Sequence, residues 1–373
     1  MTASRLKNAR RVVVKVGSNV LTTRNDLNTD AIESISRQIC QLIDRGLEVL
    51  LVSSGAMAAG MRRMGMRRRP DKVPQRQAIS AVGQSGLMKA YEDSFGRGNK
   101  KVAQILLTSD DLDHRHRYLN ARNAMNTLLE WKVVPVINEN DTVMVEEVQL
   151  GDNDNLSAMI ALLMDSDVLI NLTDIDGLYT KDPRTNTDAR LISRVETFDK
   201  KIENLASHIP GALGTGGMLS KIRAARKVTA AGVPMIIAKG EKPDILLKLF
   251  AGELHGTYFV PQEKKLASRK CWIAYTLKRK GSIRVDKGAA IALSRNGKSL
   301  LSSGIIEVHG DFGIGAAVTI IGPHRQQLGI GLVNYSATQT RTIQGLRSNQ
   351  IEHALGSKPY DEVIHRDNLV ITP

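Results

Sequence analysis

Short apolar segments rich in β-branched residues alternate with longer amphipathic segments along most of the chain. The apolar segments show little alternation with polar residues, which indicates strands buried on both faces, as in parallel sheets covered by helices. The predicted strands are residues 12–16, 48–54, 101–108, 132–138, 167–173 and 233–240. The pattern therefore predicts a buried sheet at the centre of a domain.

Helical periodicity fills the intervals between these strands. The predicted helices are residues 30–44, 75–94, 119–131, 153–165 and 218–231. Repetition of strand, helix and strand predicts an α/β domain with right-handed crossovers. Ligands of such domains usually bind where loops leave the carboxyl ends of the strands, so we expect the chemistry in those loops.

The pattern changes after residue 262. Residues 263–280 are rich in lysine and arginine and predict a connecting segment. From Gly281 onward, short strands follow one another between glycine turns, which is typical of a small β-rich module. A length of 373 residues agrees with about two domains. We therefore expect a domain over 1–262, a connector, and a module that begins at Gly281.

Cysteine content and hydropathy exclude several classes of protein. Cys40 and Cys271 are too few for a disulfide scaffold or a four-cysteine zinc site, and two reduced thiols are the simplest interpretation. No apolar run approaches the roughly 20 residues of a membrane span. The basic start leads into an apolar run too short for a signal peptide, so we predict a cytoplasmic protein without a membrane segment.

The net charge of +14 is concentrated in basic clusters at residues 1–15, 61–72 and 264–280. A surplus of this size invites comparison with proteins that bind nucleic acid or other polyanions. A solvated surface is the simplest explanation for any one cluster. Residues 281–373 contain nine basic and seven acidic residues, so charge does not predict RNA binding by the module.

Two loops offer groups that suit an anion. Lys15 and Gly17 lie at the end of the first strand, and a lysine beside glycine amides can bind phosphate. Ser53, Ser54 and Gly55 follow the second strand, where small residues leave the amides of the next helix accessible. A solvated lysine and tight strand-to-helix packing are the structural alternatives at these two places.

Two further loops are rich in carboxylates and amides. Residues 138–142 (NENDT) follow a strand and could ligate a substrate amine, although an Asx-rich turn has the same composition. Residues 151–155 (GDNDN) precede a helix and hold more Asp and Asn residues than one helix cap requires. Carboxylate oxygens also suit Mg²⁺, usually together with phosphate oxygens.

The last two loops differ in what they indicate, and only the second of them has a phosphate-binding pattern. Residues 173–180 (TDIDGLYT) follow a buried strand, and residues 214–221 (GTGGMLSK) lead into a helix and end in lysine, as phosphate-binding loops often do. The second loop is not a Walker A motif, and no G-x-G-x-x-G sequence predicts a dinucleotide site. Ser54 lies in no nucleophile elbow, and His114 and His116 lack metalloprotease spacing.

These loops occur in one specific order. The segments are VVVKVGSNVL (12–21), VSSGAMAAG (52–60), YLNARN (118–123), PVINENDTV (135–143), GDNDNLSA (151–158), LTDIDGLYTKDPR (172–184) and GTGGMLSK (214–221). Together they resemble the amino-acid kinase superfamily and, within it, the glutamate 5-kinase family. Residues 281–359 resemble the PUA module of many bacterial members, and the tail 360–373 resembles their ending. The resemblance implies a three-layer α/β sandwich with a mostly parallel central sheet, plus a small β-rich PUA domain.

The resemblance also implies roles for individual residues. Lys15 and Lys221 would act in catalysis on the ATP phosphates, and Asp154 would organise these lysines or Mg²⁺. L-Glutamate would be bound by Ser54, Asp141 and Asn153. The nucleotide site would be formed by Lys15, Thr173, Asp174, Thr215, Gly216, Gly217, Met218, Leu219, Ser220 and Lys221. Ser53 and Ser220 stand where the family often has threonine, and both keep a hydroxyl group.

The implied activity is phosphorylation of the side-chain carboxylate of L-glutamate by ATP with Mg²⁺, the first step of proline biosynthesis. The family further implies feedback inhibition by proline and a homo-oligomer, either a dimer or a tetramer. The acyl phosphate product is labile, which suggests hand-off to glutamyl-phosphate reductase. A carboxylate with a pKa of about 4.3 is ionised at neutral pH, so no general base is needed.

Three alternatives remain at this point. The first is another carboxylate kinase of the superfamily, such as acetylglutamate kinase or aspartokinase, and the PUA-like module argues against it. The second is an RNA-binding or RNA-modifying protein, although the module has few aromatic side chains for base stacking. The third is an inactive relative, and the presence of both lysines and the acidic loops argues against that.

Overall fold

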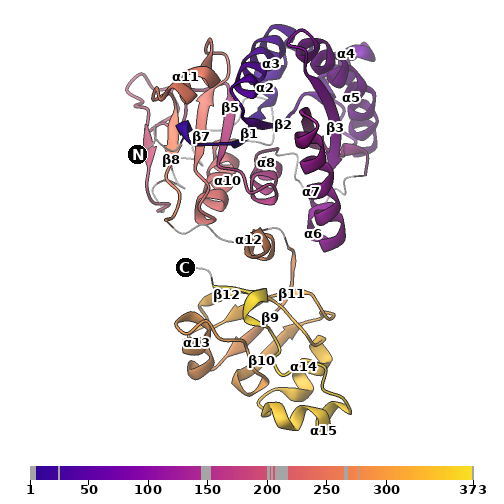
Figure 1. The fold of residues 1–373 in the computed structure, drawn as a ribbon, viewed down its shortest axis with the longest axis vertical. Coiled ribbons are helices and arrows are strands. Elements are labelled where there is room, and N and C mark those ends of the chain that lie inside the picture. The colour runs from indigo at the N-terminus through magenta and orange to yellow at the C-terminus, as the bar shows by residue number, and fades with distance from the viewer. Residues whose placement is uncertain are drawn as a thin grey trace. The chain divides into compact units, whose positions relative to one another are not determined.

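The computed structural model describes residues 6–23, 26–143, 153–199, 202, 205, 217–263, 268–275 and 277–371. The chain divides into two compact units, Met1–Lys265 and Leu266–Pro373 (Figure 1). Within the described ranges no helix is both long enough and apolar enough to cross a membrane. The predicted site residues Thr215 and Gly216 lie outside these ranges, as do positions 151 and 152.

The first unit is built on an eight-stranded sheet with the order β3-β4-β2-β1-β5-β7-β8-β6. Its strands are β1 (Arg11–Val16), β2 (Glu48–Val52), β3 (Lys101–Leu107), β4 (Val133–Glu139), β5 (Val168–Thr173), β6 (Arg194–Val195), β7 (Met235–Lys239) and β8 (Thr257–Phe259). Neighbouring strands from β3 to β7 are parallel, and β8 pairs antiparallel with β7. The predicted, mostly parallel sheet is confirmed.

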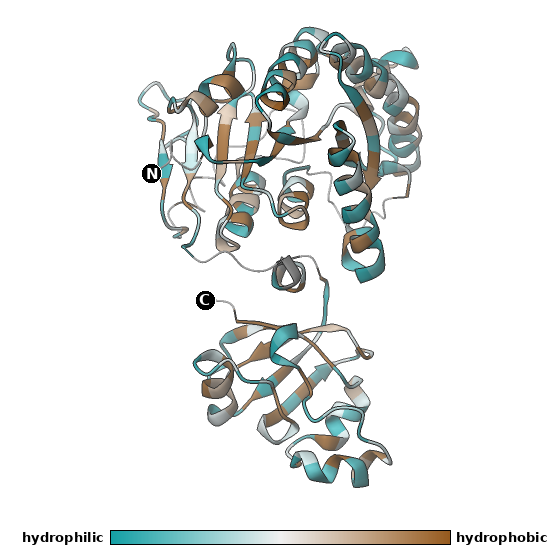
Figure 2. Ribbon diagram, viewed as in Figure 1, coloured by the Kyte–Doolittle hydropathy of each residue, from teal (hydrophilic) through white to brown (hydrophobic). Residues whose placement is uncertain are grey.

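Helices cover both faces of this sheet and complete the predicted three layers (Figure 1). The helices are α2 (Ser18–Leu21), α3 (Thr29–Asp44), α4 (Ala56–Arg63), α5 (Val73–Gly96), α6 (Ser109–Asp113), α7 (Arg115–Glu130), α8 (Asn153–Leu163), α10 (Met218–Ala230) and α11 (Ile245–Ala251). Buried residues of α3, α5 and α11 share one apolar core with the sheet. Figure 2 shows the apolar residues concentrated on the central strands, whereas the flanking helices carry both kinds of residue.

Alternation along the strands decides which side chains reach the opposite layer. Val12, Val14 and Val16 of β1 belong to the core beneath α3, so Lys15 points to the face covered by α8 and α10. Lys15 pairs with Asn171 of β5 in the parallel register, and the same alternation puts Asn171 on that face. The sheet therefore carries a lysine and an amide side by side beneath α8 and α10.

The second unit has a five-stranded sheet and an apolar core of its own. The strands are β9 (Arg279–Val285), β10 (Ile305–Gly310), β11 (Ala317–Ile321), β12 (Gln327–Leu332) and β13 (Leu369–Ile371), in the order β10-β9-β11-β12-β13. Its helices are α12 (Ser268–Tyr275), α13 (Lys287–Ser294), α14 (Ala337–Ile343) and α15 (Ile351–Leu355). Helix α12 contacts β12 and β13, so part of the expected connector belongs to this unit. The finer division into four segments stays a prediction.

Candidate active site

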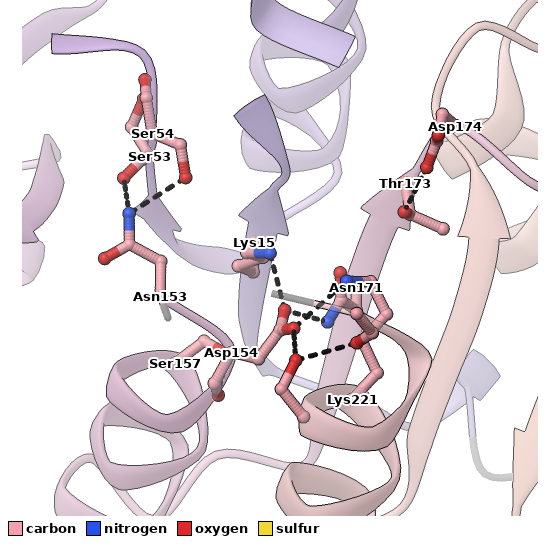
Figure 3. Close-up of polar contacts among 12 residues, drawn as sticks. Lys15, Ser53, Ser54, Asn153, Asp154, Ser157, Asn171, Thr173, Asp174 and Lys221 are labelled. Carbon is pink, nitrogen blue, oxygen red and sulfur yellow. Dashed lines mark hydrogen bonds and ion pairs between the residues drawn. The ribbon is translucent and has the colours of Figure 1, made fainter. Parts of the chain in front are cut away.

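The carboxylate of Asp154, in the first turn of α8, joins side chains from three other elements (Figure 3). Its Oδ1 accepts hydrogen bonds from Lys15 Nζ at 2.5 Å and from Asn171 Nδ2 at 2.7 Å. Its Oδ2 accepts from Ser220 Oγ at 2.7 Å and from Lys221 Nζ at 3.1 Å, both in the first turn of α10. Strands β1 and β5 and helices α8 and α10 thus meet at one carboxylate.

Two helix N-termini come together at this point. Asp154 lies in the first turn of α8, and Lys221 lies in the first turn of α10, which follows Gly217. The first backbone N–H groups of a helix have no partner within the helix, and they favour anions. Contact between the two side chains therefore places both helix starts at one edge of the sheet, where a phosphate group would meet donors from each.

Burial strengthens the electrostatics of this cluster. Asp154 is 0% exposed, and Lys15 and Lys221 are only 4% and 6% exposed. Asp154 lies between the two ammonium groups, and their charges interact strongly because water screens this buried cluster poorly. Preorganised cations in such a site stabilise negative charge that develops or gathers there during a reaction.

Asn153, the residue before Asp154, faces a different set of groups. The two N–H donors of its Nδ2 are shared among three acceptors: the backbone oxygen of Ser53 at 2.6 Å, Ser54 Oγ at 2.9 Å and Asn138 Oδ1 at 3.0 Å. Gly55, with φ of 101°, has the left-handed conformation that lets the chain turn from β2 into α4. The loop after β2 and the end of strand β4 are thereby tied to the start of α8.

Side chains of helix α5 bind both of these segments. The hydroxyl groups of Tyr91 and Ser53 lie 2.8 Å apart in a hydrogen bond, and Gln84 Oε1 accepts from Asn138 Nδ2 at 3.0 Å. Burial raises the pKa of Tyr91, although the Ser53 contact partly opposes the shift, so the phenol stays protonated. The two contacts hold the loop that carries Ser54 and the end of β4 that carries Asn138.

Asp141 begins a short 3₁₀ turn after β4, near helix α5. Burial raises the pKa of its carboxyl group, and a hydrogen bond with Ser80 and the charge of Arg69 oppose part of that shift. A half-buried carboxylate of this kind gains from a cationic ligand, because an opposite charge offsets the cost of its desolvation. The substrate ammonium group predicted for Asp141 would supply that charge.

Thr173 and Asp174 lie at the carboxyl end of β5. Thr173 Oγ1 donates to Asp174 Oδ1 at 2.9 Å, and Asn19 Nδ2 donates to Asp174 Oδ2 at 3.0 Å. Burial alone would raise the pKa of Asp174, but these hydrogen bonds, its own backbone amide and the charge of Lys221 lower it overall. Asp174 is therefore held ionised beside the lysine cluster.

The structure brings most of the predicted site residues together. Lys15, Asp154, Ser220 and Lys221 share one hydrogen-bonded cluster, and Ser54 and Asn153 share another beside it (Figure 3). Gly217 directly precedes α10, and Met218 and Leu219 begin it, with the Met218 side chain buried. The catalytic and binding roles of these residues stay predictions.

Several residues of the site were not predicted from the sequence. Asn171 is a lone amide inside an otherwise apolar buried strand, and that break in the pattern was a usable signal. Asn19 and Gln84 had no such signal, because a polar residue on a helix is ordinary. Their contacts with Asp174 and Asn138 join positions far apart in sequence, and only the fold brings these together.

Direct binding of Mg²⁺ fits Asp154 less well than its other predicted role. Both carboxylate oxygens already accept hydrogen bonds, two of them from ammonium groups that would repel a metal ion. In the part of the chain that the structure describes, no three His, Cys, Asp or Glu residues are grouped as a metal site. The donor set suits an organiser of the two lysines, and Mg²⁺ would instead enter on the phosphate oxygens of ATP.

Comparison with known proteins agrees with this geometry. The sequence model of the amino acid kinase family matches residues 10–239, and that of the PUA domain matches residues 281–355. The fold and the matched model define the class of protein: the chain belongs to the amino acid kinase family.

Two relatives narrow the assignment within that family. The glutamate 5-kinase of Geobacter metallireducens is 50% identical over 372 residues, which cover 100% of both chains. The glutamate 5-kinase of Syntrophus aciditrophicus is 48% identical over 366 residues, 98% of this chain and 95% of its own. The chain therefore belongs with the glutamate 5-kinases. The UMP kinase structure from Ureaplasma parvum aligns with 68% of this chain and 99% of its own, at 15% identity and a TM-score of 0.48.

Proposed function

We propose that this chain transfers the γ-phosphoryl group of ATP to the side-chain carboxylate of L-glutamate. The observation that carries the proposal is the first turn of α8, where Asn153 and Asp154 are neighbours. Asn153 donates a hydrogen bond to Ser54, and the Asp154 carboxylate accepts hydrogen bonds from Lys15 and Lys221. An amino-acid substrate bound at Asn153 would therefore meet phosphates bound near Asp154, at the N-terminus of α8.

The reaction must overcome the repulsion between two anions, and it needs no proton transfer to activate the nucleophile. A glutamate carboxylate oxygen attacks the γ-phosphorus, a new oxygen–phosphorus bond forms, and the bond to the β-phosphate oxygen breaks with its electron pair leaving on ADP. The attacking carboxylate, with a reference pKa of about 4.3, is already ionised at pH 7. Lys15 and Lys221 reduce the repulsion between the two anions and stabilise the transferring group, while Asp154 holds both ammonium groups in place.

The direct test is a glutamate-dependent turnover of ATP with hydroxylamine in the assay. Hydroxylamine converts an acyl phosphate into a hydroxamate and inorganic phosphate, so the bond that forms is identified along with the rate. We expect L-glutamate to give hydroxamate in step with ADP, and N-acetylglutamate and aspartate to give far less. Equal rates with aspartate or N-acetylglutamate would favour another carboxylate kinase.

Replacement of Lys221 tests the residue assignment within the proposed reaction. We expect Lys221→Ala to lower kcat about 100-fold or more, because removal of one preorganised charge-stabilising donor costs on that order in known enzymes. Arg223→Ala, two positions along the same helix and exposed, is the matched control and should keep kcat. A folded Lys221→Ala enzyme with wild-type kcat would remove Lys221 from the catalytic residues.

The proposal also covers the setting of the enzyme. Mg²⁺ would arrive with ATP, and proline would inhibit by binding near the proposed glutamate residues Ser54, Asp141 and Asn153. The enzyme would assemble as a dimer or tetramer and act in the cytoplasm. The proposal also includes hand-off of the labile product to glutamyl-phosphate reductase. The hand-off fails if free product accumulates and a physically separated reductase uses it equally well.

A further inference from the structure

Three amide side chains form a chain that leads from helix α5 to the start of α8. Gln84 Oε1 accepts from Asn138 Nδ2 at 3.0 Å, and Asn138 Oδ1 accepts from Asn153 Nδ2 at 3.0 Å. Gln84 and Asn138 are buried, at 9% and 4% exposure. The outermost amide, Asn153, is the one assigned to substrate. Gln84 therefore stands two hydrogen bonds behind a substrate-binding group.

The direction of each amide in this chain is fixed by its neighbours. Asn138 Oδ1 also accepts from the backbone N–H of Glu139 at 2.9 Å, so its Nδ2 must face Gln84. Asn153 Nδ2 is directed at Ser53, Ser54 and Asn138. In Figure 3 the carbonyl oxygen of Asn153 lies on the side away from Ser54. The Gln84 acceptor receives the Asn138 Nδ2 and so holds the Asn138 side chain in the place where its Oδ1 meets Asn153.

The other end of the Gln84 amide has no obvious structural use. Its Nε2 is buried and has no hydrogen-bond partner among the described residues. A buried donor without a partner destabilises the folded protein. An apolar side chain of similar length would avoid that cost if packing were the only requirement. The acceptor oxygen is the part of the amide that the site uses.

We propose that Gln84 is a positioning residue for the amino-acid substrate. It acts through Asn138 and holds the carboxamide of Asn153 in the orientation that binds L-glutamate. This inference rests on the proposed function, because Asn153 is a substrate residue only if glutamate is the acceptor. Gln84 itself makes no contact with the reacting phosphate in this assignment, so its effect falls on glutamate affinity and spares the phosphoryl-transfer step.

The first test is Gln84→Met, which keeps the length of the side chain and removes its acceptor. We expect the glutamate KM to rise roughly 5- to 30-fold, the effect of losing about 1–2 kcal/mol of substrate affinity. The ATP KM and kcat should stay close to wild type, because Lys15, Asp154 and Lys221 are not part of the amide chain. A fall in kcat at unchanged glutamate KM would overturn the proposal.

A double-mutant cycle with Asn138→Leu tests whether Gln84 acts through Asn138. Two residues in one hydrogen-bonded chain are not additive, whereas independent residues are. We expect Gln84→Met to have little further effect on the glutamate KM once Asn138 is replaced. Full additivity of the two changes in KM would show that Gln84 acts by another route, and it would overturn the inference.

Gln38→Met is the matched structural control. Gln38 is a buried amide of α3 that accepts from the backbone N–H of Leu246 at 2.9 Å and has no part in the amide chain of Gln84, Asn138 and Asn153. The Gln38→Met variant should have a lower Tm than the wild type, with the glutamate KM and the ATP KM unchanged. An equal rise of the glutamate KM in Gln38→Met would reduce the Gln84 effect to general destabilisation and overturn the proposal.

Gln84→Glu covers the case in which Gln84→Met does not fold. A carboxyl group keeps an acceptor for Asn138 and removes the unpaired Nε2. We expect Gln84→Glu to bind glutamate more tightly than Gln84→Met, or than Gln84→Ala if the methionine variant is insoluble, and the reverse order would overturn the proposal. Wild-type enzyme is assayed in parallel: absence of glutamate hydroxamate there refutes the proposed function, whereas a normal wild type with unaffected Gln84 variants refutes this inference alone.

Discussion

At the scale of single residues, Asp141, which is proposed to bind the substrate, works against the stability of the fold. The carboxyl group of Asp141 has a raised pKa because it is largely desolvated, and Ser80 and Arg69 offset only part of this effect. A group whose pKa is higher in the folded state than in the unfolded state favours folding at low pH. That contribution is lost as the pH rises through the folded-state pKa. At neutral pH the ionised Asp141 therefore costs stability, which substrate binding would offset.

Asp141→Asn separates these two effects. We expect the Tm at pH 7 to be equal to that of the wild type or higher, because the buried charge is removed. The glutamate KM should rise about 10-fold or more, since a hydrogen bond to a charged group contributes about 1.5–3 kcal/mol. Thermal melts and steady-state kinetics check both. An unchanged glutamate KM with a raised ATP KM would reverse the assignment of Asp141.

At the scale of elements, close packing of α4 and α5 positions the residues that are proposed to bind glutamate. A Cβ atom at Gly83 of α5 would lie 1.8 Å from the carbonyl oxygen of Ala56 in α4. A Cβ atom at Gly60 of α4 would lie 1.9 Å from the carbonyl oxygen of Ile79. Helix α4 follows directly after the loop of Ser54, and α5 carries Gln84. Backbone contact between the two helices therefore sets the distance between groups of the site.

Gly83→Ala tests this dependence. The added methyl group must push the two helices apart, and overpacking of this kind typically costs about 1–3 kcal/mol. We expect a lower Tm and a raised glutamate KM, with the ATP KM less affected. Gly86→Ala is the control three residues along α5, where a Cβ atom meets nothing within 4 Å. It should raise Tm, because alanine in a helix is favoured over glycine by about 1 kcal/mol. Equal behaviour of both variants would contradict the packing argument.

The elements also show how far the sequence alone could reach. Long apolar runs predicted β1 to β5 and β7 within a few residues, because burial on both faces leaves a strong pattern. Strands β6 and β8 are two and three residues long, too short to show any period. The family resemblance carried by the loop motifs implied that Lys15, Asp154 and Lys221 belong to one site. The partners Asn171 and Gln84 depend on strand register and on helix packing, which local sequence does not encode.

At the scale of the whole molecule, chemistry and charge are unevenly divided. The described site residues, from Lys15 to Lys221, all belong to the first unit, and the second unit has a separate apolar core. The basic cluster at 61–72 includes Arg69, whose charge lowers the pKa of Asp141. Part of the +14 surplus therefore lies near a residue that is proposed to bind glutamate. The net charge is therefore a poor argument for RNA binding, which stays an untested alternative.

A chain that ends at Lys265 tests whether the first unit is sufficient for the reaction. The sheet, both helical layers and the Asp154 cluster are complete without the second unit, so we expect glutamate-dependent hydroxamate formation to persist. Circular dichroism and a cooperative melt must first establish that the shortened chain is folded, with full-length protein as the control. A folded but inactive first unit would show that the second unit, or an assembly that requires it, completes the site, and it would transfer part of the function to residues 266–373. Activity retained at unchanged glutamate and ATP KM would leave the PUA-like unit with a role outside catalysis.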